Sequence, residues 1–174
     1  MLQRYKWLQR VIPYHKSQLN IALPYDLIVE LFASLNSTGM RINSPSRFNQ
    51  GKYKVIANGN LVKIRGPFSK NVYGSRSSRF PLETQIIIQP TSSQNETSIY
   101  IESKPTIKAL VPICFLGLSI PTFLLISGIF WDILSFDLLI ILLLYPYAII
   151  ILFFNIEVKT LINVLQEQIS TRKN

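Results

Sequence analysis

Few side chains in this sequence could carry out covalent chemistry. The chain has one histidine, His15, and one cysteine, Cys114, whereas group transfer needs a nucleophile, a base and a group that stabilises developing charge. His15 precedes the first expected strand, and we interpret it as a surface histidine near a membrane rather than a general base. Cys114 lies inside an uncharged run, where a thiol acts as a small apolar side chain. We therefore expect no catalytic residue and predict that the protein is not an enzyme.

The acidic side chains do not form the pattern of a metal or cofactor site. The nine Asp and Glu residues are scattered, and no His, Cys, Asp or Glu residues are spaced as metal ligands. Phosphate-binding loops of the form GxGxxG or GxxxxGKS are absent from the sequence. Glu83 and Glu102 fall on the last two expected strands, and we interpret each as a solvated partner of Lys or Arg. The sequence therefore predicts no metal ion and no cofactor.

Basic side chains gather in and beside the segment 66–81, GPFSKNVYGSRSSRFP. The whole chain has 18 Lys and Arg residues against nine Asp and Glu, a net charge of +9. Because the segment is rich in Ser, Gly and Arg, we expect a mobile loop or an irregular edge strand. Anionic lipid headgroups attract such residues near a membrane, whereas no nucleic-acid recognition motif accompanies them and we do not expect nucleic acid as a partner. The alternative is a solvated loop that only obeys the positive-inside rule. The candidate lipid-headgroup residues are Lys63, Arg65, Lys70, Arg76 and Arg79.

Two long uncharged runs indicate that this basic part is held at a lipid bilayer. Residues 109–131 contain 23 uncharged residues, about 34 Å of helix, which exceeds a hydrocarbon core of about 30 Å. Residues 138–154 form the second run, which becomes long enough when it is extended to 136–156. The short link DILSF between them predicts a transmembrane helical hairpin. A buried core hairpin of a soluble protein is the alternative, but it needs a much larger protein to cover it.

Charge gives the orientation of this hairpin. Lys104, Lys108 and Lys159 flank the two runs, whereas the link region carries Asp132 and Asp137 and has no Lys or Arg. The positive-inside rule therefore places both ends of the chain in the cytoplasm. We expect no secretory signal, because no apolar segment follows the basic first 12 residues. The expected parts of this integral membrane protein are a cytoplasmic domain at 1–106, the hairpin at 107–157 and a cytoplasmic C-terminal helix or tail at 158–174.

Hydrophobic periodicity predicts an α+β fold for the N-terminal domain. The apolar stripe of residues 25–35 predicts a helix that begins after Pro24. The dipeptide Asn58-Gly59 predicts the two-residue turn of a hairpin. The fold class is therefore an antiparallel meander sheet with one packed helix. The expected strands are 17–23, 52–57, 60–65, 82–89 and 98–103.

The residues after the second run predict an amphipathic helix. Val158, Ile162, Leu165 and Ile169 recur at spacings of four, three and four residues. This stripe is shorter than two heptads, too short for a coiled coil by itself. We expect the helix to dock on the sheet domain or on a partner.

Several short motifs carry a resemblance to a protein family. They are GKYKV at 51–55, NGN at 58–60, KIR at 63–65 and RFPL at 79–82, followed by the apolar runs. Over roughly residues 45–131 the chain resembles uncharacterised bacterial small membrane proteins. The resemblance implies a cytoplasmic α+β domain that runs into a two-helix transmembrane hairpin, and it implies no activity.

The function that we expect from the sequence is structural. We predict a membrane-anchored, non-enzymatic accessory or assembly protein whose cytoplasmic domain docks on a larger membrane complex. The alternative is a membrane-surface sensor that binds anionic lipid or a small ligand through the basic segment.

Overall fold

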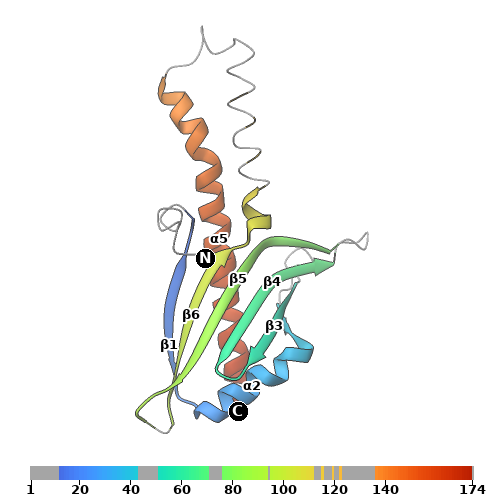
Figure 1. Cartoon of the computed structure of the whole chain (residues 1–174), viewed down its shortest axis with the longest axis vertical. Coiled ribbons are helices and arrows are strands. Elements are labelled where there is room, and N and C mark those ends of the chain that lie inside the picture. Colours follow the sequence, from blue (N-terminus) through green and yellow to red (C-terminus); the bar gives the residue numbers. More distant parts are fainter. Residues whose placement is uncertain are drawn as a thin grey trace.

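One antiparallel sheet of six strands forms the frame of the molecule (Figure 1). The computed structural model describes residues 12–42, 51–70, 76–93, 95–111, 115, 119, 122 and 136–173. The strands are β1 (His15–Ile21), β2 (Met40–Arg41), β3 (Lys52–Asn58), β4 (Leu61–Lys70), β5 (Arg76–Pro90) and β6 (Thr97–Pro105). Their order is β1-β6-β5-β4-β3-β2, so that β2 to β6 form a meander and β1 pairs with β6. The predicted α+β class and meander are confirmed, and the two-residue strand β2 is additional.

The β3–β4 turn lies one residue later than the sequence predicts. Asn58 pairs with Leu61, so the loop residues are Gly59 and Asn60. Gly59 has φ 60°, and among the described residues positive φ occurs only at glycines. Positive φ at the first loop position alone is the type II′ turn. The predicted turn at 58–59 and the observed turn at 59–60 both leave Val55 on the inner face of the sheet. The alternation of apolar and polar residues in β3 therefore does not distinguish the two turns.

The basic segment 66–81 is strand wherever the structure describes it, so the predicted loop is wrong there, whereas the pairing of residues 76–78 with β4 alone agrees with the alternative of an irregular edge strand. Its backbone extends β4 and β5, with Phe68 opposite Ser78 and Lys70 opposite Arg76. β4 and β5 are interior strands of the sheet. A bulge between Gly66 and Phe68 leaves Pro67, which has no N–H, out of the ladder. This end of the β4–β5 hairpin turns away from the long C-terminal helix (Figure 1), and residues 71–75 lie outside the described part.

Helix α2 (Tyr25–Thr38) covers the inner face of the sheet and confirms the predicted helix. Its buried side chains are Ile28, Leu31, Phe32 and Leu35. Leu27, which the sequence places in the same stripe, is half exposed instead. The helix ends at Gly39, whose φ is 65° and whose N–H donates to the carbonyl of Leu35 at 2.7 Å.

Helix α5 (Phe136–Lys173) is one continuous helix of 38 residues, about 57 Å long. It joins the predicted second span and the predicted C-terminal helix, which the sequence analysis divides at residue 157. The break is absent because no Gly or Pro occurs after Pro146 within the helix. The C-terminal part of α5 docks on the inner face, where Leu161, Val164, Leu165 and Ile169 join the main core. Docking on the sheet domain is therefore confirmed.

The N-terminal part of α5 projects beyond the sheet (Figure 1). Leu144 and Tyr145 are exposed there. Among the described residues, α5 contributes the one helix that is long and apolar enough to cross a bilayer, with a mean hydropathy of 1.9. Within the structure, 39% of this apolar stretch is buried. A core helix of a soluble protein can have the same length and the same hydropathy. The predicted first run, 109–131, lies outside the described residues except for 109–111, 115, 119 and 122, which are helical.

The docking of α5 leads to a test of stability. Leu161 is fully buried, and truncation of such a side chain leaves a cavity. We expect Leu161→Ala to lower the free energy of unfolding by about 2–5 kcal/mol. The exposed neighbour Lys159 supplies the matched control, and Lys159→Ala is expected to change it by less than about 0.5 kcal/mol. Denaturant unfolding of the full chain in detergent micelles measures both, and equal effects would contradict the docking.

Candidate functional site

A buried polar row divides the inner face of the sheet into two apolar clusters. Thr84 of β5 and Ser103 of β6 are fully buried, with their hydroxyl oxygens 2.8 Å apart. The main core lies on one side of this row. The smaller cluster contains Phe80, Leu82, Ala109, Ile150, Phe154 and Val158, and we name it the junction cluster because it joins the sheet to the projecting part of α5.

His15 lies at the β1 end of the same row, opposite Ser103 in register. The sequence places His15 on the surface, but its side chain is half-buried and its Nε2 atom has no hydrogen-bond partner among the described residues. The cause is strand parity, since His15 shares the inner side of β1 with Ser17, Leu19 and Ile21. The described residues contain no group of three metal-binding side chains, at His15 or elsewhere.

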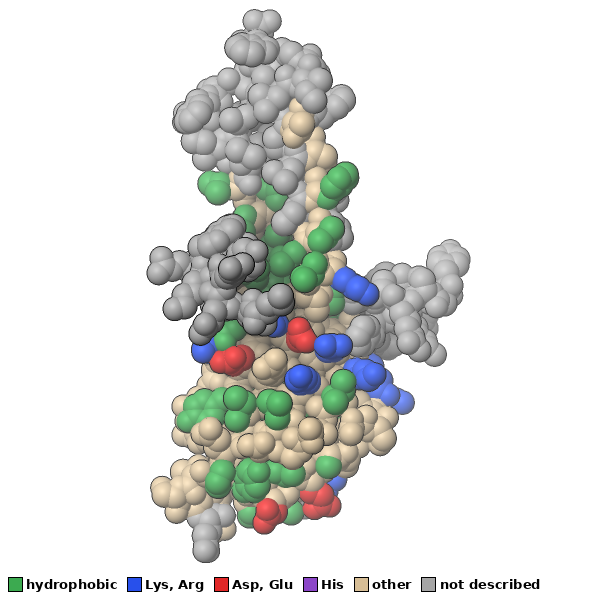
Figure 2. Space-filling model, viewed as in Figure 1, with side chains coloured by type: hydrophobic (Ala, Val, Ile, Leu, Met, Phe, Trp, Pro, Cys, Tyr) green, Lys and Arg blue, Asp and Glu red, His purple; other side chains and the backbone are tan. Residues whose placement is uncertain are grey.

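Seven charged side chains on the outer face of the sheet lie in two neighbouring cross-strand rows, which we name the charged band; Arg41 and Lys52, paired in register on β2 and β3, lie outside it. The row nearer the junction cluster runs Lys54, Arg65, Glu83, Lys104 across β3, β4, β5 and β6. The second row runs Lys63, Gln85, Glu102, Lys16 across β4, β5, β6 and β1. Five cations thus face two carboxylates. Figure 2 shows blue and red side chains gathered across this face, below a group of green, hydrophobic side chains.

The two carboxylates of the band are ion-paired. Arg65 Nη2 donates to Glu83 Oε1 at 3.0 Å, and Lys104 Nζ lies 3.8 Å from Glu83 Oε2. Lys16 Nζ lies 2.9 Å from Glu102 Oε1. The interpretation of Glu83 and Glu102 as partners of Lys or Arg is therefore confirmed. In register, however, Glu83 lies opposite Lys104 and Glu102 opposite Gln85, so the two carboxylates do not face each other.

The Lys16–Glu102 pair shifts the titration of both groups. Hydrogen bonding from Lys16 lowers the pKa of Glu102 below 4.5, and the same contact raises the pKa of Lys16 above 10.5. Lys16 Nζ also lies 5.4 Å from the ring centroid of Tyr14. Burial, and then the neighbouring Glu102, raise the pKa of Tyr14. A cation is therefore held at this corner of the band across the whole physiological range of pH.

The five candidate headgroup residues all lie on the β4–β5 hairpin, but they are spread along its length and do not form one cluster. Lys63 and Arg65 alternate along the outer face of β4, in different rows of the band. Lys70 and Arg76 are paired in register at the far end of the hairpin, and Arg79 lies three residues further along β5. Arg65 is engaged with Glu83.

The sequence analysis did not select Lys16, Lys54 and Lys104, which complete the band. Lys54 shares its side of β3 with Lys52, a periodicity that the sequence does contain. Lys16 joins the band only because β1 pairs with β6. That pairing links residues that are 76 to 88 positions apart in the sequence, and local patterns do not reveal it.

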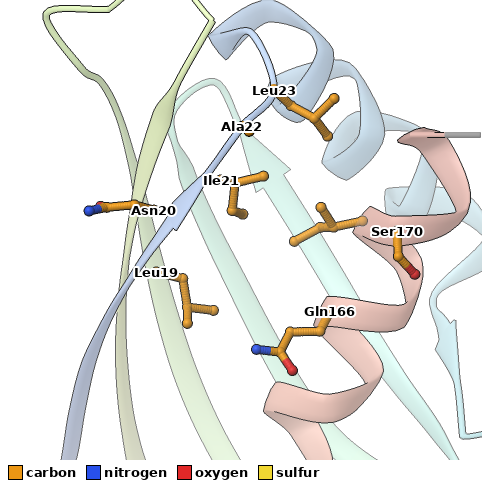
Figure 3. A pocket seen from close by; sticks show the side chains of 8 residues that line it. Leu19, Asn20, Ile21, Ala22, Leu23, Gln166 and Ser170 are labelled. Carbon is orange, nitrogen blue, oxygen red and sulfur yellow. The ribbon is translucent and has the colours of Figure 1, made fainter.

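A groove lies between β1 and the last turns of α5, at the end of the sheet away from the junction cluster. Its volume is about 290 Å³, and its apolar wall consists of Leu19, Ile21, Leu23 and Ile169. Figure 3 shows Leu19 and Ile21 pointing toward α5, with Gln166 pointing back toward β1. No charged side chain lines it. This size is at the lower limit of small-molecule sites, so the groove has room for a small apolar group and offers it one amide.

Comparison with known proteins gives only distant likenesses. No protein-family model matches the sequence, and no curated protein is detectably similar to it. A structural-genomics protein from Deinococcus radiodurans covers 56% of this chain and 86% of its own, with 9% identity and a TM-score of 0.33. A putative uncharacterized protein from Bacillus thuringiensis covers 54% and 78%, with 13% identity and a TM-score of 0.31. The protein XoxI from Bacillus cereus covers 55% and 76%, with 12% identity and a TM-score of 0.32. These likenesses assign neither a membrane family nor an activity to the chain.

The ion pair between Lys16 and Glu102 leads to a prediction about the dependence of stability on pH. Removal of the cation by Lys16→Met is expected to raise the pKa of Glu102 back toward 4.5. In the native chain the pair stabilises the fold above pH 4.5, and this contribution is lost as the pH falls through the lowered pKa of Glu102. On the alkaline side it is present below pH 10.5 and lost as the pH rises through the raised pKa of Lys16.

Carboxyl NMR titration of the full chain in micelles measures this pKa. Lys63→Met is the matched control, because Lys63 lies in the same row with Gln85 between it and Glu102. A Glu102 that titrates identically with and without Lys16 would refute the assignment of the shift to this pair.

Proposed function

We propose that this chain is a membrane-anchored, non-enzymatic accessory or assembly protein whose α+β domain docks on a larger membrane protein complex. The observation that carries the proposal is the continuity of α5. Its projecting half is apolar in sequence and exposes Leu144 and Tyr145, and its other half is part of the core of the domain. Because no linker separates the two halves, such an anchor holds the domain at a defined position and tilt. An accessory protein that presents one face to a partner needs this fixed geometry.

In this proposal, residues 109–131 and the projecting half of α5 cross the bilayer as a helical hairpin, with the sheet domain and the C-terminal end of α5 in the cytoplasm. The distribution of charge supports this orientation. Lys104, Lys108 and Lys159 lie on the domain side of the two apolar runs, and Asp132 and Asp137 lie on the other side. The charged band adds further cations at the domain side of the anchor.

The outer face of the sheet is the surface that we assign to the partner. Both α2 and α5 pack on the inner face, and no described helix or strand covers the outer one. Beyond the charged band, a row of apolar side chains crosses this face, and we name it the outer apolar row. It consists of Leu61, Ile87 and Tyr100, which are neighbours in register on β4, β5 and β6. Tyr100 is 36% exposed, and tyrosine is enriched at protein interfaces.

A second candidate function, a membrane-surface sensor for anionic lipid or a small ligand, is favoured by the extended β4–β5 hairpin. Lys70, Arg76 and Arg79 lie on its membrane-side end. Cations in that position attract anionic headgroups. This candidate places the functional contact at the membrane instead of on the outer apolar row.

Photo-crosslinking in native membranes tests the docking proposal. A benzoyl-phenylalanine at Tyr100 is expected to give a discrete crosslinked product with a membrane protein. The control is the same residue at Leu27, which is half exposed but lies on α2 at the other face. The substitution Tyr100→Asp is expected to weaken recovery of the partner at least tenfold with little change in melting temperature.

Purification in mild detergent, followed by native mass measurement, gives the second readout. A stoichiometric complex is the expected species. A chain that is recovered alone, with equal crosslinking at positions 27 and 100, would overturn the docking role. Release of the chain from membranes by alkaline carbonate would overturn the anchor itself.

A further inference from the structure

The uncharged part of α5 is barely long enough to cross a bilayer. Asp137 and Glu157 enclose 19 uncharged residues, 138–156. These residues span about 28 Å of helix, whereas a hydrocarbon core is about 30 Å thick. If α5 is a membrane span, as the proposed function requires, the hydrocarbon must extend along the whole run and reach Ile156.

Part of the same run is packed against the sheet. Ile150 and Phe154 are buried in the junction cluster with Phe80 and Leu82 of β5. Only residues 138–149, about 18 Å of helix, precede the cluster. This length is too short for the hydrocarbon core. The end of the sheet domain must therefore lie within the membrane instead of hanging below it.

The surface around the junction cluster has the composition that this placement requires. Phe80 is stacked on Phe153 of α5, with ring centroids 6.4 Å apart. Several neighbouring side chains are large, apolar and exposed although they lie beside a folded domain, and the exposed Lys108 and Asn155 lie among them. Contact with lipid surrounds the apolar side chains with an apolar solvent and removes their unfavourable contact with water. They are Ile107, Val111, Leu152, Phe153 and Ile156.

The charged band begins directly below this apolar zone. Leu82 belongs to the junction cluster, and the next residue, Glu83, is paired with Lys104 in the first row of the band. One residue of a strand corresponds to about 3.4 Å, and the second row lies about 7 Å beyond the first. Each headgroup layer is roughly 5–8 Å thick. The headgroups therefore fall at the level of the band, and the next rows of the outer face carry no charge.

We infer that the charged band is a binding surface for anionic lipid headgroups and that the bilayer surface crosses the sheet domain at this level. Glu83 and Glu102 neutralise part of the band, which keeps an excess of three positive charges. Lys54 and Lys104 are exposed and lie at the two sides of the first row. The β4–β5 hairpin leaves the sheet at the same level and turns away from α5 (Figure 1).

Depth-dependent fluorescence quenching of the full chain in vesicles tests the position of the bilayer surface. In a Cys114→Ala background, a fluorophore is attached at Gln85→Cys or at Gln89→Cys. Both positions lie on the outer side of β5, but Gln89 is four residues further from the junction cluster, about 14 Å. A nitroxide on the lipid headgroup is expected to quench the label at position 85 several-fold more strongly than the label at 89.

Lipid selectivity tests the charge. Vesicles contain phosphatidylcholine and phosphatidylglycerol, and the nitroxide is carried by either lipid. Quenching at position 85 is expected to be stronger with labelled phosphatidylglycerol. The variant Lys54→Gln/Lys104→Gln is expected to reduce this preference about fivefold or more. The matched control, Arg172→Gln/Lys173→Gln, removes two charges at the far end of α5 and is expected to leave the preference intact.

The outcomes separate this inference from the proposed function. Equal quenching at positions 85 and 89, in a chain that resists carbonate extraction, would overturn the position of the bilayer surface while the anchor stands. A preference for phosphatidylglycerol that survives Lys54→Gln/Lys104→Gln would overturn headgroup binding by the band. Extraction of the chain by alkaline carbonate would show that α5 is not a membrane anchor, and would overturn both the position of the bilayer surface and the binding of headgroups by the band.

Discussion

In the proposed anchored arrangement, one helix lies partly in the core of the sheet domain and partly in a bilayer, and the rest of the structure is arranged around that constraint. The C-terminal part of α5 contributes Leu161, Leu165 and Ile169 to a core that is closed off from water. Its other part exposes Leu144, Leu152 and Phe153, whose transfer from water to an apolar surrounding is favourable. Because a helix without Gly or Pro between the two parts resists bending, the orientation of one part determines that of the other.

The polar and apolar residues of the sheet, like those of α5, are distributed unevenly from the junction cluster toward the main core. On its inner face, the junction cluster is followed by the buried Thr84–Ser103 row and then by the main core. On its outer face, charges occupy the rows nearest the junction cluster and give way to the outer apolar row. A lipid–water interface, as in the proposed anchoring, accounts for such a concentration of charge, since headgroup charges lie in a layer of limited thickness.

The parts of the fold that were predictable from the sequence are those with a strong local pattern. The stripe Ile28, Leu31 and Leu35 predicted α2, and the alternation in β5 and β6 predicted their pairing. The extension of β4 and β5 through a Ser- and Arg-rich segment was missed, because a ladder is held by backbone hydrogen bonds that side-chain patterns do not report.

The candidate site was predictable only in part. Arg65 and Lys63 could be selected because they lie near the basic segment, whereas Lys16 and Lys104 enter the band through strand register. The half-buried position of His15 also depends on register, since it follows from the side of β1 that faces the helix. Contacts between distant strands are set by the complete sheet, and single segments do not contain that information.

The pairing of β1 with β6 also affects how the chain is made. β1 is synthesised long before its partner β6, and Ile28 of α2 shares a core with Ile169 near the end of α5. The domain therefore cannot complete its interior until the ribosome has passed the apolar segment of α5. In the proposed anchoring, membrane insertion begins on a nascent chain whose sheet domain is still incomplete. Delivery to the bilayer and closure of the sheet around α5 then finish together.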